Sequence, residues 1–238
     1  MKTYFTAVSI AALTVVLSVV TNAQVPSEET SPSASVPVAT AAAPADDDAP
    51  YTLKGGDNEL GGWGGISFKA TTIFAGLSEA EADDRKFFLA AFRYGRTLYA
   101  NDTIALQYTL DAIPLAVATG VITSRTSVGG VTVFQRDTAY GGGLSPLGLQ
   151  LDFANGSRVH PFAHVNAGFL GFTKAVPIED SGKFAFTLEG GGGVRIFTSD
   201  RRAVTLGLRL HHISNGDRSG SNRGLNQFVF YAGFSVFK

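Results

Sequence analysis

A period-two alternation of apolar and polar residues recurs along most of this sequence. Between Lys183 and Phe197 the even positions are all apolar or Gly, whereas the odd positions include Thr187, Glu189 and Arg195. This period places successive side chains on opposite faces of a β-strand. Comparable runs predict eight strands, at 59–69, 87–98, 103–111, 147–153, 161–172, 183–197, 202–214 and 226–237.

The segments between these runs differ in length. Short connections such as "ANDT" (100–103) and "ANGSR" (154–158) carry the Gly, Asn, Asp and Ser that favour turns. Longer connections are predicted at 70–86, 113–138 and 213–225. The pattern leaves the placement of 113–138 open, because this segment could hold an additional hairpin.

Alternating strands fit two architectures. A soluble barrel or sandwich points its apolar face inward, whereas a membrane barrel points that face to lipid and its polar face to the lumen. Here the polar face mixes Arg, Glu, Asp, Gln, His and Gly, and aromatic residues gather on the other face. The chain also ends in "FVFYAGFSVFK", which resembles the last strand of bacterial outer-membrane barrels. The sequence thus predicts an all-β fold, an eight-stranded antiparallel transmembrane β-barrel over 51–238, with a soluble periplasmic barrel as the alternative.

The N-terminal 50 residues differ from the rest in composition. Residues 1–23 combine Lys2, an apolar stretch and small residues before Gln24, which predicts a secretory signal peptide; a retained membrane anchor is the alternative. Residues 24–50 are rich in Pro, Ser and Ala and carry five acids without a base, which predicts a disordered acidic linker. Together with the barrel pattern, these segments predict a bacterial cell outer-membrane location.

Composition excludes several classes of function. The chain has no Cys, so disulfides, thiolate metal sites and Cys nucleophiles are ruled out. Residues 51–238 hold 18 of the 19 Lys and Arg and 15 of the 20 acids, and their mild net charge of +3 argues against a dedicated nucleic-acid surface. No phosphate loop or dinucleotide fingerprint occurs. The sequence therefore implies no cofactor and no metal.

Polar residues on the inward face are expected to pair with one another. The acids Asp111, Asp152 and Glu189 share this face with Arg195 and Arg209, which predicts a buried ion-pair network. Eight strands enclose a lumen that side chains can fill, which argues against a pore.

The stretch "RLHHISNGDRSG" (209–220) ends the seventh predicted strand. Alternate residues of a strand face opposite sides, so Arg209 and His211 are expected to face the lumen. His212 and Ser214 are expected to face outward with the preceding leucines. Asn226 opens the outward row of the eighth strand. Consecutive strands are usually neighbours, so Asn226 is expected beside His212 and Ser214.

Polar groups on a lipid-facing wall are costly unless they bond to one another. His212 could take the proton of Ser214 as a general base, with Asn226 orienting the ring. Asn215 and backbone N–H groups of the following turn, including Gly216, could stabilise an oxyanion. Alternatively, the same residues form a polar cap where the membrane core ends.

The C-terminal residues "HISNGDRSGSNRGLNQFVFYAGFSVF" resemble the PagL-like lipid A 3-O-deacylases, outer-membrane proteins similar to acyloxyacyl hydrolases. Weaker likeness includes "NELGGWGGISF" and "YTLDAIPLA". The resemblance implies an eight-stranded outer-membrane barrel that removes the ester-linked acyl chain at the 3-position of lipid A. Its partners would be lipid A of lipopolysaccharide and outer-membrane lipid. The oligomeric state is open, a homodimer included.

By its motif, the resemblance implies that His212 is the base, Ser214 the nucleophile and Asn215 part of the oxyanion site. The family's acid is a Glu fourteen residues beyond the His, and here that position is Asn226. Asn can hold the imidazole but cannot offset its charge, so a slower enzyme is expected. Asp217 is a candidate substitute acid. A non-catalytic structural or adhesive barrel with a decayed site is the alternative.

Overall fold

The computed structural model of the protein describes residues 50–73, 84–128, 131–220 and 222–238. The predicted signal peptide and, apart from Pro50, the predicted acidic linker lie outside these residues. The strands are β1 (Asn58–Ser67), β2 (Ala70–Thr71), β3 (Lys86–Ala100), β4 (Ile104–Val128), β5 (Val131–Phe153), β6 (Val159–Phe172), β7 (Phe184–Ser199), β8 (Arg202–Ser214) and β9 (Leu225–Phe237). A short 3₁₀ helix, η1 (Glu179–Ser181), lies between β6 and β7. In the described part of the chain, no helix is long and apolar enough to cross a membrane.

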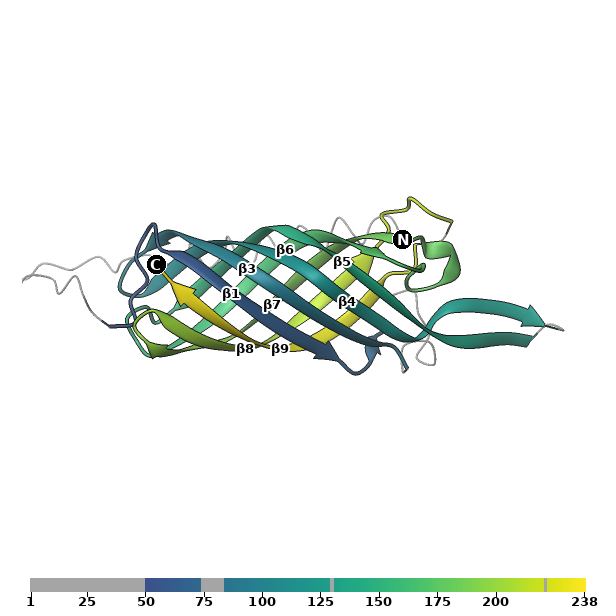
Figure 1. The fold of residues 1–238 in the computed structure, drawn as a ribbon, viewed down its shortest axis with the longest axis horizontal. Helices are drawn as coiled ribbons and strands as arrows, with labels where there is room; N and C mark the ends of the chain where they lie inside the picture. The colour runs from purple at the N-terminus through teal and green to yellow at the C-terminus, as the bar shows by residue number, and fades with distance from the viewer. Residues whose placement is uncertain (1–49, 74–83, 129–130, 221) are drawn as a thin grey trace, which may run out of the picture. The chain divides into compact units, whose positions relative to one another are not determined.

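The strands form one closed antiparallel sheet (Figure 1). Neighbours follow the chain from β1 through β3 to β9, and β9 pairs back with β1. The two residues of β2 pair with Gln227 and Asn226 of β9. The fold is therefore the predicted eight-stranded barrel, with β2 as a short addition beside the last strand.

The prediction for 113–138 was wrong, because this segment is neither a long loop nor an extra hairpin. It belongs to β4 and β5, which continue past the neighbouring strands as one extended hairpin (Figure 1). The pairing of β4 with β5 shifts register where β5 has one extra residue between Ser145 and Gly148, and where β4 has one extra residue between Ile113 and Ala116. Each such bulge changes which face the following residues occupy. The bulges therefore interrupt the alternation of apolar and polar residues, and the sequence of these strands resembles that of a loop.

Residues of the two faces differ as a membrane barrel requires. The outward side chains are large and apolar, with Phe92, Leu147 and Phe230 each more than half exposed. The inward residues are buried and mostly polar or charged. This distribution inverts that of a soluble protein and suits a wall that faces lipid.

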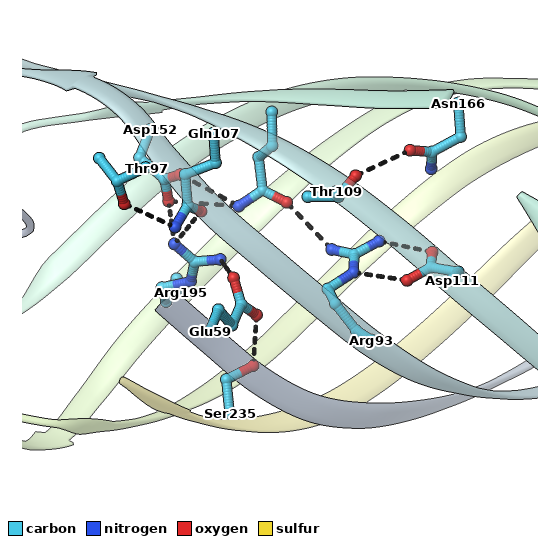
Figure 2. A network of polar contacts seen from close by, with 11 residues as sticks. Glu59, Arg93, Thr97, Gln107, Thr109, Asp111, Asp152, Asn166, Arg195 and Ser235 are labelled. Carbon is cyan, nitrogen blue, oxygen red and sulfur yellow. Dashed lines mark hydrogen bonds and ion pairs between the residues drawn. The ribbon is translucent and has the colours of Figure 1, made fainter. Parts of the chain in front are cut away.

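Ion pairs and hydrogen bonds link the inward side chains (Figure 2). Arg195 contacts Glu59 and Asp152, each at 2.9 Å, and its guanidinium also donates to Gln107 Oε1 at 3.0 Å. All four side chains are buried. This cluster confirms the predicted ion-pair network. It lies near the end of the barrel where β1 begins and β9 ends.

A second part of the network lies further along the lumen. Arg93 donates two hydrogen bonds to Asp111, at 2.8 and 2.7 Å (Figure 2). Arg209 contacts Glu189 at 2.6 Å and lies 4.0 Å from the ring centroid of Trp63. Charged side chains thus occupy the lumen, as the sequence predicted, and the aromatic Trp63 lies among them.

The two ends of the barrel have different connections. At one end, the backbones of Asn58 and Lys238 exchange hydrogen bonds, so the first and last strands begin and end together there. The turns at 101–103, 154–158 and 200–201 lie at the same end and are short. The connections at 173–183 and 215–224 lie at the other end and are longer. Because outer-membrane barrels have short periplasmic turns and longer extracellular loops, this second end is the extracellular one.

Candidate active site

The last residues of β8 place two adjacent histidines on opposite faces of the barrel wall. Leu206 and Leu208 are exposed on the outer face, whereas Arg209 is fully buried in the lumen. His211 follows the inward row and lies 3.2 Å from Glu189. His212 follows the outward row and lies at the extracellular end of the strand. The structure therefore gives these histidines the separate directions that the parity predicts.

A chain of hydrogen bonds orients His212. The β8–β9 register sets His212 directly across from Asn226, and the His212 Nδ1 atom is hydrogen-bonded to Asn226 Oδ1. The amide nitrogen of Asn226 donates to the backbone carbonyl of Ile73, which follows β2. A carbonyl can only accept, so the NH₂ group must face Ile73 and the oxygen must face the imidazole. His212 then carries its proton on Nδ1, and its Nε2 atom has the lone pair that a general base needs.

A glycine in the preceding loop lies against the same ring. A Cβ atom at Gly224 would come within 2.9 Å of His212 Cε1 and 3.6 Å of its Nδ1. Any other residue there would have to displace the imidazole. The ring is therefore oriented by Asn226, and the lack of a side chain at Gly224 leaves room for it.

Ser214 is the last residue of β8 and is buried where the strand meets the turn. Its Oγ atom accepts the backbone N–H of Gly216 at 3.1 Å, and Gly216 has a left-handed conformation with φ of 65°. In the described part of the chain, the hydroxyl has no hydrogen bond to the ring of His212. The structure thus brings the two side chains to one face, with the hydroxyl turned toward the turn.

Asn215 ties the turn to the neighbouring connection. Its amide nitrogen donates to the carbonyl of Ser181 at 2.8 Å, and its side-chain oxygen accepts the N–H of Asp217 at 3.0 Å. Asp217 lies on the exposed surface of this turn. The hydrogen bond that holds the imidazole comes from Asn226 and not from Asp217, the predicted substitute acid.

Aromatic residues of β7 flank the site. Phe186 lies directly across from Ser214 in the β7–β8 pairing, and its ring contacts that of Phe184 edge to face. The guanidinium of Arg218 lies 5.8 Å from the centroid of Phe184 and 6.0 Å from that of Phe186. A cation thus stands beside an apolar wall, next to the predicted nucleophile.

Sequence reasoning did not find Ile73, Gly224 or Arg218 as part of this neighbourhood. Ile73 contributes only a backbone carbonyl, which no side-chain pattern can mark. Gly224 precedes the last strand by one residue, and its contact depends on how the loop returns. Among the residues that the structure describes, no three His, Asp or Glu side chains gather as metal ligands would.

Comparisons with known proteins place this geometry in context. The crystal structure of the outer membrane enzyme PagL aligns with a TM-score of 0.43 at 14% identity, over 76% of this chain and 98% of that one. The outer membrane protein OprG from Pseudomonas aeruginosa gives a TM-score of 0.43 at 13% identity, over 79% and 99%. Neisserial surface protein A gives 0.42 at 14%, over 76% and 96%. No curated protein matches the chain.

A family model supplies the assignment. The model described as lipid A 3-O-deacylase (PagL) matches residues 90–235, which is more than half of the chain. The match includes β8, the loop that follows it and most of β9, so it contains His212, Ser214 and Asn226. The chain therefore belongs to the lipid A 3-O-deacylase (PagL) family and is a β-barrel of the outer membrane.

Proposed function

We propose that this protein is a membrane-embedded serine esterase that removes the ester-linked acyl chain at the 3-position of lipid A. The observation that carries the proposal is the chain of contacts from Ile73 through Asn226 to His212. This chain fixes the imidazole in the tautomer that a base needs, on the outer wall, two residues from a serine. A polar cap alone has no need of such an arrangement.

In the proposed reaction, Ser214 turns from the N–H of Gly216 toward His212. Nε2 of His212 takes the hydroxyl proton while Oγ attacks the ester carbonyl carbon. The imidazolium then gives that proton to the departing sugar oxygen, and an acyl-serine remains. Water, deprotonated by the same His212, attacks the acyl-serine, and the fatty acid leaves as Ser214 regains its proton.

The groups near Ser214 suit the charge that develops in this reaction. The N–H of Gly216 lies 3.1 Å from Oγ and becomes available when the hydroxyl turns away. It is the proposed oxyanion donor. The amide of Asn215 is held by Ser181, so its proposed part is to fix the turn that presents this N–H.

The position of the site along the wall agrees with a lipid ester. His212 and Ser214 lie at the extracellular end of β8, with the exposed Leu208 and Phe230 further along the wall toward the periplasmic end. An acyl chain can lie along this apolar surface while its ester reaches the serine. The headgroup would then lie beside the exposed Arg218.

The test is to incubate the refolded barrel with lipid A and to follow the product by mass spectrometry. The expected result is loss of one hydroxyacyl chain with the wild type and no loss with Ser214→Ala. Ser219→Ala, a change in the same loop, is the matched control and should keep the activity. No loss with the wild type, or equal loss with Ser214→Ala, refutes the proposal.

Asn226 favours a second candidate, a structural or adhesive barrel whose site has decayed. The family's motif has a Glu at this position, and an amide cannot offset the charge of an imidazolium. Asn226→Glu separates the two candidates. Activity gained from a silent parent would support decay, whereas an active parent would exclude it.

A further inference from the structure

The connection between β1 and β2 contains one more residue than the stretch of β9 opposite it. Between the last pair of β1 with β9 and the first pair of β2 with β9, three residues (67–69) face two residues (228–229). Phe68 and Lys69 are both exposed, although successive residues of a regular strand face opposite sides. The extra residue makes a β-bulge, which moves the later residues of the chain to the other face of the wall.

The bulge decides which residue lies across from Asn226. In the observed register this residue is Thr71. If the register of β1 continued unchanged, Ala70 would take its place, because each partner would shift by one residue. The hydroxyl oxygen of Thr71 accepts the backbone N–H of Ile73 at 3.2 Å, and the carbonyl of Ile73 accepts the amide of Asn226. An alanine has no acceptor for this N–H, so the turn that presents the carbonyl depends on the bulge.

Gln227 holds the bulge from the lumen side of the wall. Its side-chain oxygen accepts a hydrogen bond of 2.6 Å from the hydroxyl of Ser67, the first residue of the bulge. The same hydroxyl lies 3.0 Å from the carbonyl oxygen of Lys69, so its single proton is shared between the two acceptors. The amide nitrogen of Gln227 donates to the carbonyl of Arg85, just before β3, at 3.4 Å. One side chain thus ties together the end of β1, the start of β3 and β9.

The contact between Ser67 and Gln227 is sealed from solvent and from lipid. The two residues are 1% and 0% exposed. A buried polar group that loses its partner is costly, so each of the two side chains holds the other in place. Because both face the lumen, they do not touch a lipid at the outer wall. Gln227 can therefore affect His212 only through the backbone and the contacts of its neighbour Asn226.

We propose that Gln227 is a positioning residue that sets the tautomer of His212. With Ser67 it fixes the bulge and hence the turn at Ile73. The carbonyl of Ile73 then keeps the amide oxygen of Asn226 directed at the ring. When this clamp is lost, the amide can turn over and present its NH₂ group to Nδ1, so that the ring proton moves to Nε2. The consequence for catalysis rests on the proposed function, whereas the tautomer does not.

The tautomer is measured from the imidazole nitrogen chemical shifts of the refolded barrel, with isotope-labelled histidine and at a pH where the ring is neutral. A barrel with His212→Gln identifies the signals of His212 among those of the four histidines. The wild type should show a protonated Nδ1 and an unprotonated Nε2. Gln227→Met keeps most of the side-chain volume and removes both hydrogen bonds, so the two shifts should approach each other as the tautomers mix. Ser67→Ala should have the same effect.

Thr97→Val is the matched control for the loss of a buried hydroxyl. Thr97 Oγ1 also bonds a buried glutamine side chain, that of Gln107 at 3.2 Å, but near the periplasmic end of the lumen. This variant should leave the shifts of His212 unchanged. Gel mobility identifies the folded barrels, and one folded clamp variant, Ser67→Ala or Gln227→Met, is enough for the test. Unchanged shifts in a folded clamp variant, or a similar change in Thr97→Val, overturn the proposal.

Kinetics on lipid A give a second readout. Gln227→Met should lower kcat about tenfold, because a partly wrong tautomer costs less than the ~10⁴-fold loss of a fully wrong one. KM should not change, because the residue faces the lumen and does not touch the lipid. A wild-type kcat in this variant, or a loss confined to KM, contradicts the proposal. A wild-type barrel that is silent toward lipid A would refute the hydrolysis, and the nitrogen shifts would still decide the role of Gln227.

Discussion

At the scale of single residues, the amide of Asn226 makes a contact that a carboxylate could not. Its oxygen accepts from His212, as the oxygen of a Glu would, and its nitrogen donates to the carbonyl of Ile73. A carboxylate has no proton to donate and would repel that carbonyl. The residue at 226 therefore lacks negative charge, but its second hydrogen bond fixes its orientation. Slow turnover with a well-ordered ring is the expected consequence.

Asn226→Leu keeps the volume of the side chain and removes both hydrogen bonds. Without an acceptor at Nδ1, the ring of His212 loses its fixed tautomer. A wrong tautomer in a serine hydrolase costs as much as ~10⁴-fold in rate, so we expect a loss of at least ~100-fold in lipid A deacylation. The rate is measured by mass spectrometry on barrels that remain folded by gel mobility. Wild-type activity in this variant would show that Asn226 does not orient the base.

Gly224→Ala tests the other contact of the ring. The added methyl carbon would lie 2.9 Å from His212 Cε1, so the imidazole must move. We expect deacylation to fall by at least ~10-fold, because shifts of about 1 Å at a reacting group cost that much or more. Gly220→Ala is the control in the same loop, since its Cβ would meet only Asp180, at 3.9 Å. Equal rates for the two variants would argue against a constrained ring.

At the scale of elements, the connection after β8 is attached to the connection before β7. Asn215 bridges them through Ser181 and also closes its own turn through the N–H of Asp217. Asn215→Ala removes both bonds. We expect trypsin to cleave after Arg218 several-fold faster, together with slower deacylation. Asn222→Ala, later in the same loop, should change neither. Unaltered proteolysis of Asn215→Ala would show that the loop is held by other contacts.

Period-two alternation was enough to predict β8 and β9, whose bounds agree with the sequence to within one residue. It failed for β4 and β5, because a bulge between Ile113 and Ala116 changes the parity within β4 and one between Ser145 and Gly148 changes it within β5. The approach of Asn226 to His212 was predictable, since both lie on adjacent strands with matching parity. The contribution of Ile73 was not, because a backbone carbonyl leaves no trace in the side-chain pattern.

At the scale of the whole molecule, the ion-pair network holds the barrel from within. Arg195→Met leaves the carboxylates of Glu59 and Asp152 buried without the cation opposite them. Removing one partner of a buried pair costs about 3–5 kcal/mol, and we expect that loss in the free energy of unfolding by urea in lipid vesicles. Arg201→Met breaks an exposed pair with Asp57 and should cost less than about 1 kcal/mol. Similar losses in the two variants would contradict a network that stabilises the barrel.

The contact between Ile73 and Asn226 joins the two ends of the sheet. Ile73 follows β2, near the first strand, and Asn226 belongs to the last, so the two meet only after the seam between β1 and β9 has closed. While the chain is still inserting into the membrane, Asn226 lacks the contact with Ile73 that orients it toward His212. In a refolding time course, deacylation should therefore rise together with the compact, heat-modifiable band and not before it. The barrel would not deacylate lipid during assembly and would become active only when the last step of folding is complete.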